Sequence, residues 1–153
     1  MAVVERTASG TAILEIGGNK MEAELTEAIH NLQLDDCVHF NGFVSGEKKT
    51  GLLRRTDVFV LPSYNEGLPI SILEAMSYGC AILSTPVGGI PEIVRDNGIL
   101  VEPGNIQGIA DTIFELADTS SCRQMGLVSQ EIVKAFYPDS VMSSLSQIYL
   151  SLL

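Results

Sequence analysis

The fold is decided by the stretch Pro62-Ser63-Tyr64-Asn65-Glu66-Gly67-Leu68-Pro69-Ile70-Ser71-Ile72-Leu73-Glu74-Ala75-Met76. It follows a short apolar run that predicts a buried strand over residues 58–61. It also predicts a helix that has Pro69 in its first turn, runs to about Tyr78 and ends at Gly79. Glu66 precedes this helix and Glu74 lies in its second turn, so two carboxylates flank a helix N-terminus at a strand end.

Outward from this stretch, short apolar runs alternate with helical patterns. The runs cover residues 12–16, 37–40, 58–61, 81–84 and 98–101. The helical stripes are Met21, Leu25, Ile29 and Leu32; Ile106, Ile109, Ile113 and Leu116; Met125, Val128, Ile132 and Phe136; and Val141, Leu145, Ile148 and Leu152, the last with Asp139 as its expected N-cap. Near-continuous hydrophobicity in the runs favours a parallel sheet covered on both faces. The 153 residues therefore predict one α/β domain.

Glycine and proline follow most of the expected strands, at Gly17-Gly18-Asn19, Asn41-Gly42, residues 62–67 and residues 86–89. In an open parallel sheet, ligands bind outside the carboxyl ends of the strands. For any single loop, a tight turn between strand and helix explains the glycine equally well. Four such loops at one edge favour a ligand site.

Charge and cysteine content exclude several function classes. Nine Lys and Arg against nineteen Asp and Glu give a net charge of −10, which argues against nucleic acid or an anionic membrane as main partner. Cys37, Cys80 and Cys122 are too far apart for a zinc site or a disulfide framework, so we expect buried thiols and no metal. The sequence shows no signal peptide and no membrane-length apolar run, and we expect a cytoplasmic protein without a cofactor.

A helix N-terminus can bind an anion through its backbone amides and macrodipole, without Lys or Arg. A carboxylate on each side suits vicinal hydroxyls, because each ionised carboxylate accepts several hydrogen bonds. An anion between two diols describes a nucleotide-diphosphate sugar. On spacing alone, the plainer interpretation that Glu66 and Glu74 only complement the helix dipole remains open.

The segment resembles the signature of the retaining, GT-B-fold glycosyltransferases of group 1. That family carries two glutamates with seven residues between them, in the setting Pro-Ser-x-x-Glu-Gly-x-Pro followed by Leu-Glu-Ala-Met. Further blocks match in order and spacing, and the resemblance spans roughly residues 12 to 150. These blocks are residues 38–44, residues 57–63, Thr85-Pro86-Val87-Gly88-Gly89-Ile90-Pro91-Glu92-Ile93-Val94, and residues 97–105.

The resemblance implies the donor-binding half of a GT-B fold, a Rossmann-like parallel sheet with flanking helices. Glu66 would contact hydroxyls of the donor sugar as the catalytic residue, and Glu74 would hold the ribose diol. The other implied substrate-binding residues are Gly67, Leu68, Pro69 and Ile70 at sugar and diphosphate, Gly42, Phe43 and Val44 at the nucleobase, and Gly17, Gly18, Gly88 and Gly89 along the cleft.

The implied activity is transfer of a sugar to an acceptor with retention of configuration. Two alternatives stay open: a non-catalytic nucleotide-sugar binding or interaction module, and an epimerase or phosphorylase of the same architecture. The donor base, the sugar and the acceptor are not determined by the sequence. The implied partners are the nucleotide-diphosphate sugar and the family's N-terminal acceptor domain, with no nucleic acid; a homo-oligomer and membrane contact through the absent half are compatible with the resemblance.

The sequence departs from the family at its start. Residues 1–11 do not resemble the opening strand, helix and basic pair of the family's donor domain, so residues 12–153 are interpreted as a partial domain that lacks its first strand. Either residues 12–16 then pair directly with residues 58–61, or another chain or residues near Val3-Val4 fill the gap. We expect the isolated chain to be inactive as a transferase.

The remaining polar candidates are weaker. His30 and His39 are expected to have ordinary structural roles, and Tyr64 is a weak candidate for packing on the sugar. The basic cluster Lys48, Lys49, Arg54 and Arg55 predicts a solvated helix face, with contact to a membrane-bound acceptor or the missing domain as the alternative.

Overall fold

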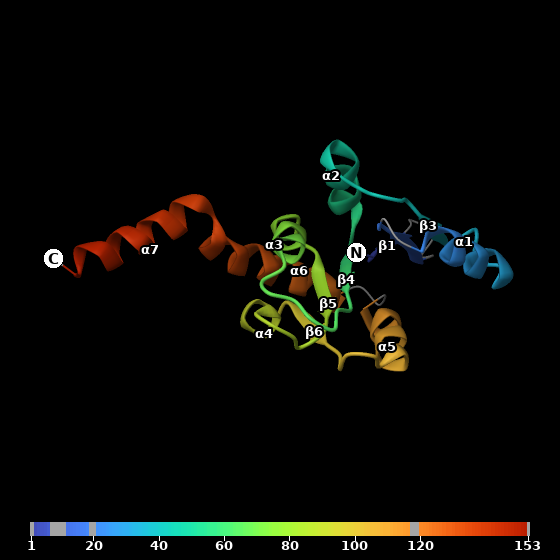
Figure 1. The fold of residues 1–153 in the computed structure, drawn as a ribbon. Helices are drawn as coiled ribbons and strands as arrows, with labels where there is room; N and C mark the ends of the chain where they lie inside the picture. Colours follow the sequence, from blue (N-terminus) through green and yellow to red (C-terminus); the bar gives the residue numbers. More distant parts are fainter. Residues whose placement is uncertain (1, 7–11, 19–20, 117–119, 153) are drawn as a thin grey trace.

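The structure is a computed structural model that describes residues 2–6, 12–18, 21–116 and 120–152. Its centre is a six-stranded sheet in the order β3-β2-β1-β4-β5-β6, with helices on both faces (Figure 1). The strands are β1 (Ala2–Arg6), β2 (Ala12–Ile16), β3 (Val38–Phe40), β4 (Val58–Leu61), β5 (Ala81–Ser84) and β6 (Gly98–Leu100). The helices are α1 (Glu22–Asn31), α2 (Gly46–Arg55), α3 (Ile70–Ser77), α4 (Ile90–Ile93), α5 (Ile106–Leu116), α6 (Ser120–Val133), the 3₁₀ turn η1 (Lys134–Phe136) and α7 (Pro138–Leu150). The predicted α/β class and its five apolar strands are confirmed.

Strand β1 fills the middle of the sheet. It runs antiparallel to both neighbours, with Val3 opposite Glu15 of β2 and Phe59 of β4. Direct pairing of residues 12–16 with residues 58–61 was therefore wrong, and the alternative that residues near Val3-Val4 fill the gap is confirmed. The orientation follows from the five residues between β1 and β2, because a parallel connection needs a crossover of a dozen residues or more.

The sheet is buried on both faces, and neighbouring residues of each central strand point to opposite cores. One core contains Val3, Phe59 and Ile82 and is covered by α2, α3, α4 and the end of α6. The other contains Val4, Val58 and Leu83 and is covered by α5 and the start of α6. This double burial explains why the central strands are apolar at nearly every position.

Several expected helix stripes differ from the observed packing. In α6 the fully buried residues are Cys122, Gly126, Ser129 and Val133. The predicted stripe lies beside them: Met125 and Ile132 are half-buried and pack against the two cores, whereas Phe136 is exposed. The cause is close approach: a Cβ on Gly126 would stand 2.1 Å from the backbone oxygen of Gly79. The small residues therefore face the sheet most closely, and the apolar stripe predicted from the sequence lies only at the edge of the buried face.

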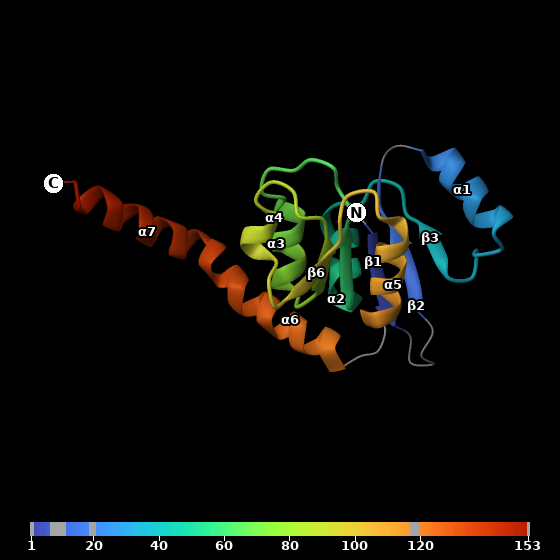
Figure 2. The same cartoon turned by 90° about the horizontal axis from the view of Figure 1, so that it is seen from below.

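The last helix also differs from expectation. Tyr137 precedes α7, Pro138 occupies its first turn and Asp139 lies inside that turn, so Asp139 is not the N-cap. Pro138 suits this position because the first helical N–H groups lack intrahelical partners anyway. Figures 1 and 2 show α7 extending away from the sheet, and the predicted stripe residues Val141, Leu145, Ile148 and Leu152 are exposed.

No disulfide joins the three cysteines, all of which lie in the described residues; Cys80 and Cys122 are buried, whereas Cys37 is only half-buried. Within the described ranges, no helix is long and apolar enough to cross a lipid bilayer.

Candidate functional site

The carboxyl ends of β2, β3, β4, β5 and β6 share one edge of the sheet. Strands β2 and β4 point the same way because both are antiparallel to β1, and β3, β5 and β6 run parallel to them. The loops that carry the sequence-predicted site residues follow these strand ends. They form two groups on this edge, separated by β1.

The first group is built on the signature loop, residues 62–69, which is tied to the end of β5. Buried Thr85 accepts a hydrogen bond from the Ser63 backbone N–H at 3.2 Å and donates its hydroxyl to the Ser63 carbonyl at 2.6 Å. The Ser63 hydroxyl in turn donates to Oε1 of half-buried Glu66 at 2.7 Å. The Glu66 carboxylate is thus oriented by its own loop and not left free in solvent.

The glycine pair after β5 packs against the same loop. The Gly89 N–H donates to the Gly67 carbonyl at 2.8 Å. Gly88 has a φ of +55°, and a Cβ there would overlap the Glu66 carbonyl oxygen. Glu66, Gly67, Gly88 and Gly89 are therefore neighbours, although twenty residues of sequence separate the two pairs.

Helix α3 begins one residue later than the sequence suggested. Pro69 is buried and extended, with φ −72° and ψ 113°, so it is the N-cap and not part of the first turn. It lacks an N–H in any case, and Leu68 and Ile70 on either side are exposed. The helix ends as predicted: Gly79 has φ +78°, and the N–H groups of Gly79 and Cys80 bond back to Met76 and Ala75.

Glu74 is paired with Lys49, which was predicted from the sequence to lie on a solvated helix face. The Lys49 ammonium of α2 donates to Oε2 of Glu74, and the two side chains are 26% and 40% exposed. The prediction for the basic cluster was therefore wrong for Lys49. Lys48 and Arg54 are exposed as predicted, although Lys48 also donates to the Asn41 carbonyl at 3.0 Å. Arg55 is exposed too, but it pairs with Glu5 and Glu15.

The second group joins the loops after β2 and β3. The Gly18 N–H donates to the Gly42 carbonyl at 2.9 Å, and the Asn41 N–H donates to the Ile16 carbonyl at 2.8 Å. Gly42 adopts a φ of +63°, which favours glycine. Val44 is buried beneath this turn, whereas Phe43 is 74% exposed. Gly17, Gly18 and residues 42–44 thus form one unit.

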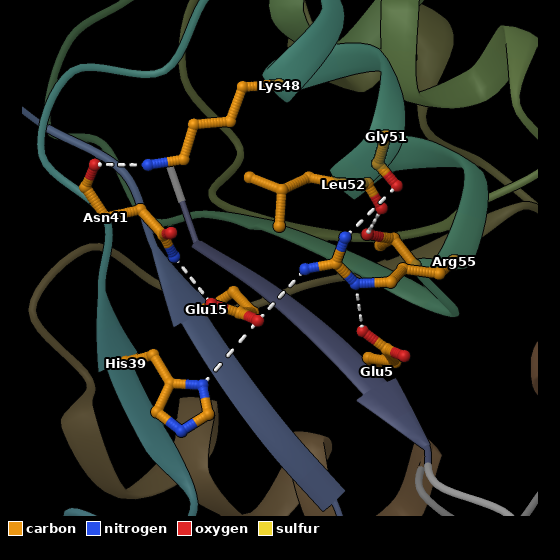
Figure 3. A network of polar contacts seen from close by, with 9 residues as sticks. Glu5, Glu15, His39, Asn41, Lys48, Gly51, Leu52 and Arg55 are labelled. Carbon is orange, nitrogen blue, oxygen red and sulfur yellow. Dashed lines mark hydrogen bonds and ion pairs between the residues drawn. The ribbon is translucent and has the colours of Figure 1, made fainter.

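A buried carboxylate that was not predicted from the sequence is hydrogen-bonded to Asn41, which precedes this unit (Figure 3). Glu15 of β2 accepts hydrogen bonds from the Asn41 side-chain amide and, at 3.1 Å, from Arg55; His39 Nδ1 lies 3.6 Å away. Burial alone would raise the pKa of Glu15, but the bonds from Asn41 and Arg55 and the nearby His39 together hold it below its usual value. Burial likewise opposes the charge of Arg55, yet Glu5 and Glu15 raise its pKa. The one sequence signal was an acidic residue inside an apolar strand.

The two remaining candidates, His30 and Tyr64, take no part in these contacts. His30 Nδ1 lies 3.6 Å from Asp35, and both side chains are exposed. Tyr64 is 78% exposed, and its hydroxyl would stand 3.1 Å from a Cβ at Gly104, so it packs beside the loop after β6.

The chain is similar in sequence to known glycosyltransferases. A family model described as "Glycosyl transferases group 1" matches residues 1–119. The amylovoran biosynthesis glycosyltransferase AmsK of Erwinia amylovora is 36% identical over 67% of this chain and 27% of its own length. The N-acetyl-alpha-D-glucosaminyl L-malate synthase of Bacillus anthracis is 32% identical over 92% of this chain and 38% of its own. The chain thus spans between a quarter and two fifths of the length of these two relatives.

The chain is also similar in fold to solved structures. The sucrose-phosphate synthase of Thermosynechococcus elongatus superposes with a TM-score of 0.76 at 27% identity, over 90% of this chain and 38% of that one. Anabaena HepE in complex with UDP-glucose superposes with a TM-score of 0.75 at 26% identity, over 91% and 40%. By sequence and by fold, the chain belongs to the group 1 glycosyltransferases.

Proposed function

We propose that residues 12–153 form the partial donor-binding half of a transferase that moves a sugar from a nucleotide-diphosphate sugar to an acceptor, with retention of configuration. The observation that carries this proposal is the placement of Glu66 and Glu74 on either side of the α3 N-terminus, at the edge where the glycine loops gather. The family membership of the chain and its likeness to HepE, which was solved with UDP-glucose, support the choice of a nucleotide-diphosphate sugar as ligand.

The diphosphate would bind at the start of α3. The amides of Gly67, Leu68 and Ile70 and the helix macrodipole supply positive potential without a cation, which suits a chain with a net charge of −10. In the reaction, the bond between the sugar C1 and the phosphate oxygen breaks and the nucleoside diphosphate leaves with the electron pair. The same amides stabilise the negative charge that develops on the departing phosphate.

Glu66 would bind hydroxyls of the donor sugar. The Ser63 hydroxyl occupies its Oε1, so the carboxylate is held in one orientation while its second oxygen retains acceptor capacity. Glu74 would accept hydrogen bonds from the ribose diol, and the backbone of residues 42–44 would border the nucleobase. Gly17, Gly18, Gly88 and Gly89 would line the cleft.

We further propose that the 153-residue chain alone binds nucleotide but has negligible transferase turnover, because the acceptor half of the family is not within it. A module that binds a nucleotide sugar without transferring it is the second candidate. Assaying transfer and hydrolysis of UDP-glucose, with and without an added N-terminal domain, separates the two: turnover that returns with the added domain supports the transferase.

The site assignment is tested by titrating labelled protein with UDP, GDP and ADP and with UDP-glucose, followed by NMR. Glu74→Ala is expected to weaken binding of the nucleoside diphosphate about tenfold, because it removes charge-assisted hydrogen bonds. Glu66→Ala is expected to weaken only the binding of the nucleotide sugar. Glu115→Ala, at an exposed site on α5, controls for loss of one negative charge. Equal effects of the first two variants on bare UDP would contradict the assignment.

A further inference from the structure

Helix α2 links the two groups of loops at the carboxyl edge. It begins directly after residues 42–44, with Ser45 as its N-cap, and the Lys49 N–H bonds to the Ser45 carbonyl. From this first turn, the Lys49 side chain reaches across to the second turn of α3, where its ammonium donates to Oε2 of Glu74. The contact joins residues 25 positions apart and lies partly out of solvent.

We propose that Lys49 is a positioning residue: it holds the Glu74 carboxylate in the orientation that accepts the ribose hydroxyls of the nucleotide. The inference rests on the proposed function, because it assumes that Glu74 faces the ribose. A free glutamate side chain samples several rotamers, and fixing it on ligand binding costs affinity. An ammonium already bound to one oxygen removes much of that cost.

The chemistry of the pair is compatible with simultaneous ligand binding. A carboxylate has about four acceptor positions on two oxygens, and Lys49 occupies one of them on Oε2. Oε1 and the remaining lone pair of Oε2 can still accept from two hydroxyls. The Lys49 ammonium keeps its positive charge when it bonds to Glu74. Two of its three N–H donors remain available to a ligand that carries a diphosphate.

The neighbouring lysine provides a matched comparison. Lys48 has the same charge and lies on the same helix, but its ammonium is exposed and donates to the Asn41 carbonyl at 3.0 Å, not to Glu74. Partly exposed ion pairs contribute little to stability, so removal of Lys49 is expected to affect ligand discrimination more than folding. The general effect of a lost positive charge on an anionic ligand is controlled by dideoxy nucleotides, which carry the same diphosphate without the ribose hydroxyls.

The experiment measures dissociation constants of the full 153-residue chain for UDP, GDP and ADP and for their 2′,3′-dideoxy counterparts by titration calorimetry. For the nucleotide that binds, the wild type is expected to prefer the ribose form. Lys49→Met is expected to weaken the ribose form about tenfold while leaving the dideoxy form nearly unchanged. Lys49→Arg should restore part of the preference, and Lys48→Met should leave it intact.

Each other outcome is decisive. If Lys49→Met weakens the ribose and dideoxy forms alike, Lys49 acts on the diphosphate or the fold, and the positioning role is refuted. If it leaves the ribose preference unchanged or strengthens it, the ion pair is incidental or competes with the ligand, and the inference also fails. A preference that disappears in Glu74→Ala but survives in Lys49→Met overturns the inference alone. A wild type without any ribose preference overturns both the inference and the proposed role of Glu74.

Discussion

The backbone of Gly88 lies against the carbonyl oxygen of Glu66, so close that a Cβ at position 88 would stand 2.0 Å from it. Gly88 also adopts a φ of +55°, which residues with a Cβ rarely adopt. The next residue, Gly89, donates its N–H to the Gly67 carbonyl. The loop after β5 therefore sets the position of the loop that carries Glu66.

Gly88→Ala is expected to separate these two loops, because the overlap is with backbone and cannot be relieved by a side-chain rotation. We expect a loss of about 1–3 kcal/mol in the free energy of unfolding, measured in urea, and loss of UDP binding. Gly51→Ala on α2 is the control: its Cβ meets open space, and removing a helical glycine should stabilise by about 0.5–1 kcal/mol. A Gly88→Ala variant as stable as the wild type would refute the coupling of the loops.

The central position of β1 gives a second prediction. Val3 is 1% exposed and lies between Glu15 of β2 and Phe59 of β4. Val3→Asp places an uncompensated carboxylate in the core, and we expect a loss of about 3–5 kcal/mol, measured by thermal or urea unfolding. Ala12→Asp, at an exposed position of the adjacent strand, should change stability far less. Similar effects of the two variants would place β1 outside the sheet interior.

The polar network beneath the loop after β3 predicts an acid-sensitive contribution to stability. The pKa of Glu15 is lowered from its usual 4.5 in the folded state, so the unfolded chain takes up the proton first as pH falls. Ionised Glu15 therefore stabilises the fold above about pH 4.5, and this contribution is lost as pH decreases through the folded pKa. Glu15→Gln should flatten the acid limb of urea stability measured from pH 6 to pH 3; an unchanged slope would contradict the network.

Arg55 is the cation of this network, and its removal is expected to act through Glu15. Arg55→Met leaves the carboxylate buried with fewer donors, so the pKa of Glu15 should rise and its stabilising contribution should diminish. Because the Arg55 side chain is 46% exposed, solvent screens part of the interaction, and we expect a loss of about 1–2 kcal/mol at pH 7. Combining Arg55→Met with Glu15→Gln should lose less than the sum of the single variants. Additive losses would show that the two residues do not interact.

The buried thiol of Cys80 predicts selective chemical protection. Burial raises the pKa of Cys80 to about 12, with smaller contributions from Cys122 and Asp57. The reactive thiolate is therefore scarce at pH 8. We expect iodoacetamide to label half-buried Cys37 well before Cys80 in the native chain, as followed by mass spectrometry of peptides. All three thiols should react in urea. Rapid labelling of native Cys80 would contradict its burial.

Local sequence patterns predicted the elements better than their contacts. The five apolar runs became strands, and the stretch from Val58 to Gly79 gave both the strand-loop-helix unit and its glycine end, because these features depend on near neighbours in sequence. Helix α6 was predicted as a helix, but the centre of its buried face was missed, since Gly126 faces the body for steric reasons and not for its hydrophobicity.

The polar contacts of the site could not have been predicted in the same way. Lys49 meets Glu74 and Arg55 meets Glu15 only because α2 is placed against both β1 and α3, and sequence spacing does not encode that placement. The orientation of β1 was accessible in principle, because five residues cannot make a parallel crossover. Charge patterning along α2, by contrast, indicated a solvated face, whereas the tertiary fold supplies acidic partners for Lys49 and Arg55.

Because β1 runs against its neighbours, its first residue, Ala2, pairs with Ile16 and Val60 near the ends of β2 and β4. Anything fused ahead of Ala2 would therefore emerge at the rim where the donor is proposed to bind. An affinity tag or fluorophore attached there would report on, or obstruct, that opening. The end of α7, by contrast, lies well away from the sheet (Figure 1), and a group attached beyond it would leave the rim clear.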